Sequence, residues 1–146
     1  MKKNMCLIIG MAILLIGMSI TPSTGINLVK QSTKAALDGN TLYVGCLGPG
    51  CYSKIQDAID DASDGDIVFV YDESSPYNES IEIDKTINLI GENRDTTKIC
   101  SIDTITILAD FINISGFSIF NYWGYSLSIC SSYNTISYNN FTKSPY

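Results

Sequence analysis

The chain has 146 residues, a formal net charge of −6 and no histidine. This length suits a single domain. The acidic balance argues against nucleic acid and anionic membrane surfaces as partners, because both would repel the chain.

The segment 1–25 is organised like an export signal. Two lysines precede the uncharged run MCLIIGMAILLIGMSI (5–20), and the small residues Ser23 and Gly25 follow it. The run is shorter than the roughly 20 residues that span a bilayer, so an uncleaved anchor is the weaker alternative. We predict a signal peptide at 1–25, a mature chain from about Ile26, membrane contact only through this signal, and a secreted or cell-surface location.

Four cysteines follow the signal, and outside the cytosol they suggest disulfides. Cys46 and Cys51 flank the flexible LGPG and can close a small loop, whereas Cys100 and Cys130 can pair only if the fold brings them together. Free thiols that pack as small apolar residues are the alternative. A zinc site is disfavoured, because neither pair has the short spacing of zinc knuckles.

The first predicted elements are a linker, a strand and a helix. Residues 26–40 are polar without a clear period, and TLYVG (41–45) is a predicted strand. In SKIQDAIDDASDGD, Ser53 and Gln56 form a capping box and apolar residues recur at helical spacing. The pattern predicts one short amphipathic helix over 53–63.

The rest of the chain is a succession of short predicted strands that repeats itself. When TITILADFINISGFSIF is laid on the later segment SLSICSSYNTISYNNFT, Phe111 meets Tyr133 and Ile114 meets Ile136. Repeats of this length with several short strands are typical of a β-solenoid. In ADFINISGF, we expect Ile112 and Ile114 to point into the stack, Asn113 to face water and Gly116 to turn the chain.

The run YNESIEIDKTINLIG (77–91) resembles the opening of right-handed parallel β-helix proteins. The matching residues alternate: Tyr77, Glu79, Ile81, Ile83, Lys85, Ile87, Leu89 and Gly91. The preceding IQDAIDDASDGDIVFVY resembles the helix and first strand that cap such proteins. The resemblance implies an all-β, right-handed parallel β-helix with a short N-terminal capping α-helix, whose cap and first coils occupy 41–146. The group includes pectate lyases, pectinesterases, NosD-type periplasmic proteins and carbohydrate-binding or sugar-hydrolysing surface proteins.

No catalytic residue is predicted. Polysaccharide enzymes of this fold need carboxylates and a basic or amide group gathered on one outer sheet. Where the pectinesterase-like pattern would place its glutamine and aspartate, the chain reads NYWGYSLSICSSYN. Asp103 and Asp110 are interpreted as turn and corner residues, and Arg94 as a solvated turn charge.

No cofactor or metal site is predicted either. DDASDGD (60–66) has the spacing of a calcium loop, but Ala62 occupies a ligand position and Tyr71 stands where a bidentate Glu is needed. NosD-type proteins are associated with copper-enzyme maturation, yet soft-metal capture requires Met, His or free Cys. The exported part of the chain has neither Met nor His.

Two groups of surface residues are candidate sites. Glycosylation sequons begin at Asn78, Asn113 and Asn140, although the last two can equally be asparagines that stack at coil turns. Tyr122, Trp123 and Tyr125 surround Gly124 and can stack on sugar faces. The alternative for these rings is that they fold over the edge of the core.

The sequence therefore predicts an exported cell-surface β-helix repeat protein with a structural or glycan-contacting role, a polysaccharide or cell-surface glycan as partner, and no catalysis of its own. The alternative is the N-terminal fragment of a polysaccharide-processing enzyme whose active coils lie beyond Tyr146. Nothing after Asn140 resembles a cap, and an open coil exposes unpaired backbone groups. We expect a fragment of a longer solenoid, or self-association through the C-terminal coil.

Overall fold

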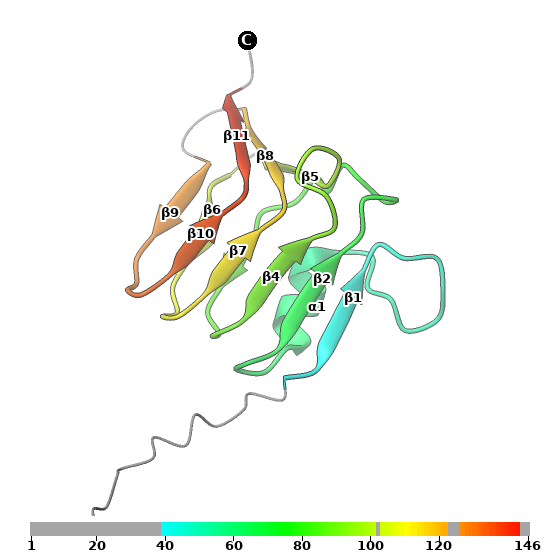
Figure 1. Ribbon diagram of the computed structural model, residues 1–146, viewed down its shortest axis with the longest axis horizontal. Helices are drawn as coiled ribbons and strands as arrows, with labels where there is room; N and C mark the ends of the chain where they lie inside the picture. The colour runs from blue at the N-terminus through cyan, green and yellow to red at the C-terminus, as the bar shows by residue number, and fades with distance from the viewer. Residues whose placement is uncertain (1–38, 102, 123–125, 144–146) are drawn as a thin grey trace, which may run out of the picture. The chain divides into compact units, whose positions relative to one another are not determined.

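The computed structural model describes residues 39–101, 103–122 and 126–143 (Figure 1). They belong to one compact unit. The predicted signal peptide and all but the last two residues of the predicted linker lie outside the described residues. Within the described ranges, no helix is long and apolar enough to cross a membrane.

The described chain forms short parallel β-strands and a single short α-helix. Their bounds are β1 (Thr41–Val44), α1 (Ile55–Asp61), β2 (Ile67–Val70), β3 (Glu82–Ile83), β4 (Asn88–Gly91), β5 (Lys98–Ser101), β6 (Ile105–Ile107), β7 (Asn113–Ser115), β8 (Ser118–Asn121), β9 (Leu127–Ile129), β10 (Thr135–Ser137) and β11 (Asn140–Lys143).

The strands form three parallel sheets. Sheet A has the order β1-β2-β4-β7-β10, sheet B has the order β5-β8-β11 and sheet C has the order β3-β6-β9. Neighbouring strands of a sheet come from successive turns of the chain, as the colours of sheet A show in Figure 1. This arrangement is a parallel β-solenoid of about four turns, which confirms the predicted fold class at that level.

The strand register confirms the internal repeat. Ile136 pairs with Ile114, and Phe141 pairs with Ile119. Ile129 pairs with Ile107 in sheet C. Each pair has the same separation in the chain as the predicted match of Phe111 with Tyr133, so the sequence repeat is the repeat of the coils.

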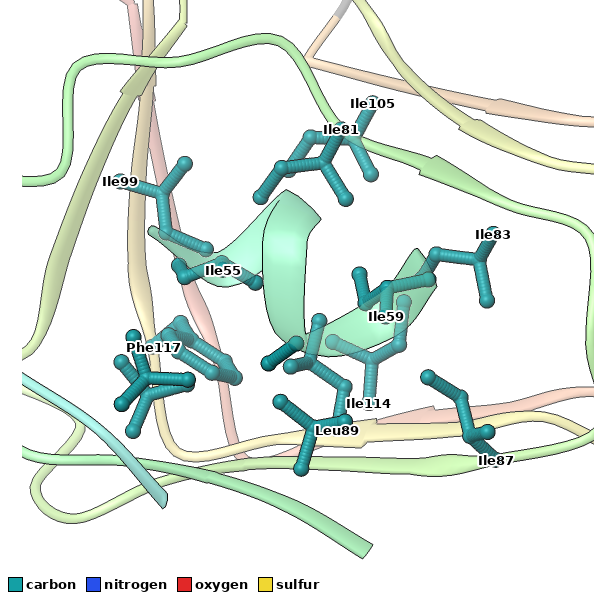
Figure 2. Close-up of a cluster of buried hydrophobic side chains, with 14 of the residues drawn as sticks. Ile55, Ile59, Ile81, Ile83, Ile87, Leu89, Ile99, Ile105, Ile114 and Phe117 are labelled. Atoms are coloured by element: carbon teal, nitrogen blue, oxygen red, sulfur yellow. The ribbon is translucent and has the colours of Figure 1, made fainter. Parts of the chain in front are cut away.

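The core lies inside the coils, where side chains from all three sheets converge (Figure 2). Ile112 and Ile114 are buried in it, as the alternation in ADFINISGF predicts. Asn113 between them is half-buried on the outer face. Gly116 has φ of +84°, and a Cβ atom there would lie 2.2 Å from the carbonyl oxygen of Gly91. Only glycine therefore fits where the chain turns so close to the coil before it.

Helix α1 begins differently from the prediction. The capping box of Ser53 and Gln56 is wrong, because the N-cap residue is Lys54 and it makes no side-chain cap hydrogen bond. Instead, the backbone N–H groups of Ile55 and Gln56 donate to the two carboxylate oxygens of Glu79, at 2.9 and 3.0 Å. A carboxylate satisfies the free donors and the positive end of the helix dipole better than a neutral hydroxyl.

Gln56 is not available for capping because its side chain binds the edge of β3. Its Oε1 accepts from the backbone N–H of Glu82 at 2.9 Å, and its Nε2 donates to the Glu82 carbonyl at 3.2 Å. The amide thereby continues the hydrogen-bonding pattern of sheet C toward the helix.

The other end of α1 is held by Lys85. Its ammonium group donates to the carbonyl oxygen of Ile59 at 3.0 Å and also to that of Asp60. The buried face of the helix, with Ile55 and Ile59, belongs to the core and lies between the converging side chains in Figure 2. Glu79 and Lys85, both in the motif that resembles β-helix proteins, thus fix the two ends of the helix.

Candidate functional site

Three aromatic side chains gather on the outer face of sheet A. Tyr43 lies on β1, Phe69 on β2 and Tyr71 directly after β2. The ring centroids of Phe69 and Tyr71 are 5.1 Å apart, and Tyr43 lies 6.3 Å from Phe69 and 6.1 Å from Tyr71. Tyr43 is 44% exposed, and the other two are half-buried. We call these three residues the outer aromatic patch.

Strand alternation places the patch on the surface. Successive side chains of a strand point to opposite faces, so the valines of β1 and β2 fill the core while Tyr43 and Phe69 point outward. The register sets Tyr43 beside Phe69, and Phe69 beside Ile90 of β4. The patch therefore spans the neighbouring strands β1 and β2 and adjoins Ile90 of β4.

The strands that carry and flank the patch are uncharged, and one carboxylate adjoins it, that of Glu92, which follows Gly91 of β4 as Tyr71 follows its partner Val70 of β2. The row of outward residues next to it contains Thr41, Ile67, Asn88 and Asn113. Strands β1, β2, β4 and β7 contain no Asp, Glu, Lys or Arg. The face combines aromatic rings with hydroxyl and amide groups on a rigid sheet, which suits a neutral ligand that has apolar faces and a polar edge.

A second aromatic group links successive coils. The rings of Phe111 and Tyr133 are 5.1 Å apart and nearly parallel, at 8°. Both residues have φ of 59°, a left-handed conformation that costs a residue with a side chain about 1 kcal/mol or more. Aromatic stacking of about 0.5–1.5 kcal/mol offsets this strain. The rings cover one another and so stabilise the stack of coils.

Tyr138 plays a comparable part at the corner between sheets A and B. It occupies the left-handed position that Gly116 has in the previous coil, with φ of 54°. The guanidinium of Arg94 lies 4.7 Å from the centre of its ring, and Nε of Arg94 is 3.6 Å from Asp95. Arg94 lies in a turn with its side chain 38% exposed, which agrees with its interpretation as a solvated turn charge, and it contacts both of these residues.

The three sequons differ in accessibility. Asn78 is exposed, and its amide donates to the nearby carbonyl of Pro76 at 3.2 Å. Asn113 lies on β7 beside Asn88, and its side-chain oxygen is buried without a hydrogen-bond partner. The amide of Asn140 donates to Asp95 at 2.9 Å. Asn78 is therefore the sequon most open to an enzyme.

The predicted glycan-contacting rings are only partly within the described residues. Tyr122 is exposed at the end of β8. Trp123 and Tyr125 lie outside the described residues, so their role stays a prediction.

Of the two candidate disulfide pairs, the structure has the first and not the second. Cys46 and Cys51 form a disulfide, with their Cα atoms 5.8 Å apart. Cys100 and Cys130 are free thiols, because one lies on β5 in sheet B and the other follows β9 in sheet C. Burial raises the pKa of the Cys100 thiol, and the nearby Lys98 opposes this effect.

The carboxylates that sequence analysis considered bind neighbouring backbone or hydroxyl groups. Asp110 accepts from the N–H of Ser132 at 2.7 Å, and Asp64 accepts from the N–H of Thr86 at 2.9 Å. Asp103 accepts from the hydroxyl of Ser80 at 3.3 Å. These side chains connect one coil with the next. Among the described residues, no group of His, Cys, Asp and Glu side chains could hold a metal ion.

Sequence analysis missed the outer aromatic patch. The alternation in TLYVG and IVFVY does place Tyr43, Phe69 and Tyr71 on one face of their strands. The missing information was the pairing of β1 with β2 across the intervening helix, which brings the three rings together.

Comparison of the chain with models of protein families, with curated proteins and with solved structures found no match. The class of the protein, a parallel β-solenoid, is therefore defined by its sheet topology.

Proposed function

We propose that this chain is an exported cell-surface solenoid that contacts neutral glycans through the outer aromatic patch and catalyses no reaction of its own. The proposal includes the finer assignments from the sequence: a cleaved signal, a right-handed β-helix of the pectin-lyase-like type, and α1 as its N-terminal cap. The single observation that carries the glycan role is the set of partly exposed rings of Tyr43, Phe69 and Tyr71 on a sheet face whose strands carry no charged residue.

The chemistry of the patch suits a sugar ring. The C–H face of a pyranose packs on an aromatic ring, while its hydroxyl groups require donors and acceptors at the edge. Thr41 and Asn88 supply such groups in the adjacent row of the same sheet. Because the rings stand on paired strands, little conformational freedom is lost on binding.

Charge favours a neutral glycan over an acidic one. The chain has a net charge of −6, so it repels a polyanion at long range. Two of its basic groups are already engaged, Lys85 with the end of α1 and Arg94 with Asp95 and Tyr138. Sugar acids would therefore be repelled by the net charge of the chain.

Binding to insoluble glycans tests the proposal. We expect the protein to co-sediment with at least one of cellulose, chitin and mannan, and to bind polygalacturonate less well at low salt. Tyr43→Thr keeps a β-strand former at an exposed position but removes the ring. Loss of about 1 kcal/mol of ring contact raises the Kd roughly fivefold.

Phe111→Asn is the matched control. It also removes an exposed ring, and asparagine tolerates the left-handed backbone there. This variant should bind as tightly as the unmodified protein. No binding to any neutral glycan, or equal weakening by both substitutions, would overturn the assignment of the site.

A further inference from the structure

We propose that Asn78 is the preferred acceptor of an N-linked oligosaccharide on the folded chain, and that the fold withholds the sequon at Asn113. In the cell, this modification rests on the export that forms part of the proposed function, because N-glycosylation belongs to exported chains. The site is separate from the outer aromatic patch on sheet A. Asn78 follows Tyr77, which bridges to Ile99 of sheet B, and precedes β3 of sheet C.

The main chain of the Asn78 sequon is unpaired. In the described part of the chain, the main-chain N–H and C=O groups of residues 78–80 make no hydrogen bond with other main-chain groups. The pairing stops at Tyr77 and resumes at β3. An enzyme that modifies a peptide segment has to surround it, and an unpaired surface segment leaves room for that without unfolding.

The two groups that define the sequon share one face of this segment. Asn78 and Ser80 are exposed, whereas Tyr77 and Ile81 are buried, which is the alternation of an extended chain. Glu79 points away from the sequon, since both of its carboxylate oxygens accept from N–H groups of α1. The acceptor amide and the hydroxyl two residues later therefore project together into solvent, without the acidic residue between them.

The side-chain hydrogen bonds of the sequon lie at the surface. The Asn78 amide donates to the carbonyl oxygen of Pro76 at 3.2 Å, and the Ser80 hydroxyl donates to the carboxylate of Asp103 at 3.3 Å. Pro76 and Asp103 are both exposed, so water or an enzyme can replace either bond. Neither interaction obstructs the approach of a sugar donor.

The reaction is a glycosyl transfer from a polyprenyl-phosphate-activated oligosaccharide. The amide nitrogen of Asn78 attacks the anomeric carbon of the sugar, where a C–N bond forms while the C–O bond to phosphate breaks. The lipid phosphate leaves with the electron pair of that bond, and the amide proton passes to a base of the transferase. The chain supplies the nucleophilic amide and the Ser80 hydroxyl by which the sequon is recognised.

The Asn113 sequon has the same residue pattern in a different main-chain environment. Its three residues form β7, which pairs with β4 on one side and with β10 on the other. Asn113 is half-buried, and its side-chain oxygen is buried. A transferase could surround this segment only after β7 had left the middle of sheet A, which requires the adjoining coils to open.

The Asn140 sequon is intermediate between the other two. It lies on β11, whose main chain pairs with β8. Asn140 is half-buried, and its amide donates to the carboxylate of Asp95 at 2.9 Å. A hydrogen bond to an ionised acceptor holds the reacting amide more firmly than the neutral carbonyl holds that of Asn78. We therefore expect transfer to Asn140 to be slower than transfer to Asn78.

The test is transfer in vitro to the purified, folded chain. The enzyme is an oligosaccharyltransferase that requires only Asn-x-Ser/Thr, supplied with its lipid-linked donor. Synthetic peptides of residues 73–83, 108–118 and 135–145 are the matched controls, because they present the three sequons without the fold. Mass spectrometry of proteolytic fragments gives the initial rate at each site.

The expected result is a different ratio of chain to peptide at each site. The rate at Asn78 should lie within about tenfold of its peptide, because a surface loop opens at almost no free-energy cost. Asn140 should react at least about tenfold more slowly than its peptide, and Asn113 at least about a hundredfold more slowly, because paired strands must open first.

Two substitutions separate recognition from folding. Ser80→Ala should abolish transfer to Asn78, whereas Ser80→Thr should retain it. Both variants should keep the unfolding midpoint of the unmodified chain, because Ser80 is exposed. Transfer that persists in Ser80→Ala would contradict recognition of the sequon.

The proposal is overturned if Asn78 of the folded chain is not modified while its peptide is, or if Asn113 reacts as fast as its peptide. The assay uses purified protein, so its result does not depend on export or on glycan binding. Failure of export would appear as an uncleaved segment 1–25 in the cell, and failure of the glycan role as an absence of co-sedimentation. The two proposals can therefore fail separately.

Discussion

The two halves of the solenoid are built from the same coil but end in different ways. Residues 39–110 contain nearly all of the charges, and at their end α1 lies on the core and is fixed by Glu79 and Lys85. Residues 111–142 are uncharged, and their last coil leaves apolar side chains half exposed. Ile107 and Ile129 have the same residue type and are register partners, yet only the first is fully buried. The burial of such a side chain therefore depends on whether a further coil of the described chain lies against it.

The strongest test of this difference between the two halves is to truncate the side chain at equivalent positions of two coils. Ile107→Ala removes a fully buried side chain and should lower the free energy of unfolding by about 3 kcal/mol. Ile129→Ala removes its half-exposed register partner and should cost less than about 1 kcal/mol in the monomer. Urea unfolding at about 1 μM measures both.

The unmodified protein and Leu108→Ala, a substitution at an exposed residue outside the core, provide the references. If Ile129→Ala proves as destabilising as Ile107→Ala, the last coil is covered in solution even at low concentration. The contrast between the two halves would then be wrong.

A smaller effect is expected where the helix is joined to the first coils. Glu79→Ala removes the acceptor for the N–H groups of Ile55 and Gln56 and should lower the free energy of unfolding by about 1–2 kcal/mol. Glu82→Ala, slightly further along the chain and exposed, is the control and should change it by less than about 0.5 kcal/mol. Equal effects of the two substitutions would show that Glu79 acts through net charge alone.

The coil repeat was predictable because it follows from the local alternation of apolar and polar residues along the strands. Isoleucines at every second position, interrupted by Gly116, gave the inward face, and the match between the two later segments gave the register of β7 with β10. The same match set Phe111 opposite Tyr133, which the structure shows as a stacked pair. These features follow from periodicity alone.

What could not be predicted depends on partners distant in the sequence. Ser53 and Gln56 have a capping pattern, but the carboxylate of Glu79 outcompetes it from another part of the chain. The spacing of Cys100 and Cys130 does not reveal that they lie on different sheets. Prediction of the outer aromatic patch requires the register of β1 against β2, and the sequence repeats do not indicate this register.

The smallest predicted effect concerns Tyr77, in the charged half. Its side chain is buried, and its hydroxyl donates to the carbonyl oxygen of Tyr71 at 2.6 Å. Burial, with lesser contributions from the charges of Glu79, Asp72 and Glu92, raises the pKa of Tyr77 to about 12 from its ordinary value of 10.0. The folded protein therefore keeps a proton that the unfolded chain releases between pH 10 and 12.

This difference sets the sign of the pH dependence. Where the folded state binds more protons than the unfolded state, the free energy of unfolding falls as the pH rises. Tyr77 thus contributes stability that is fully present below about pH 10 and is lost as the pH approaches 12. Tyr77→Phe should cost about 1 kcal/mol at pH 7 through the lost hydrogen bond, and less at alkaline pH. Urea unfolding of both proteins between pH 7 and 11.5 measures the difference between their free energies of unfolding. The titration of the lysines affects both proteins equally and therefore cancels in this difference. A constant difference across that range would mean that the Tyr77 proton is not retained by folding.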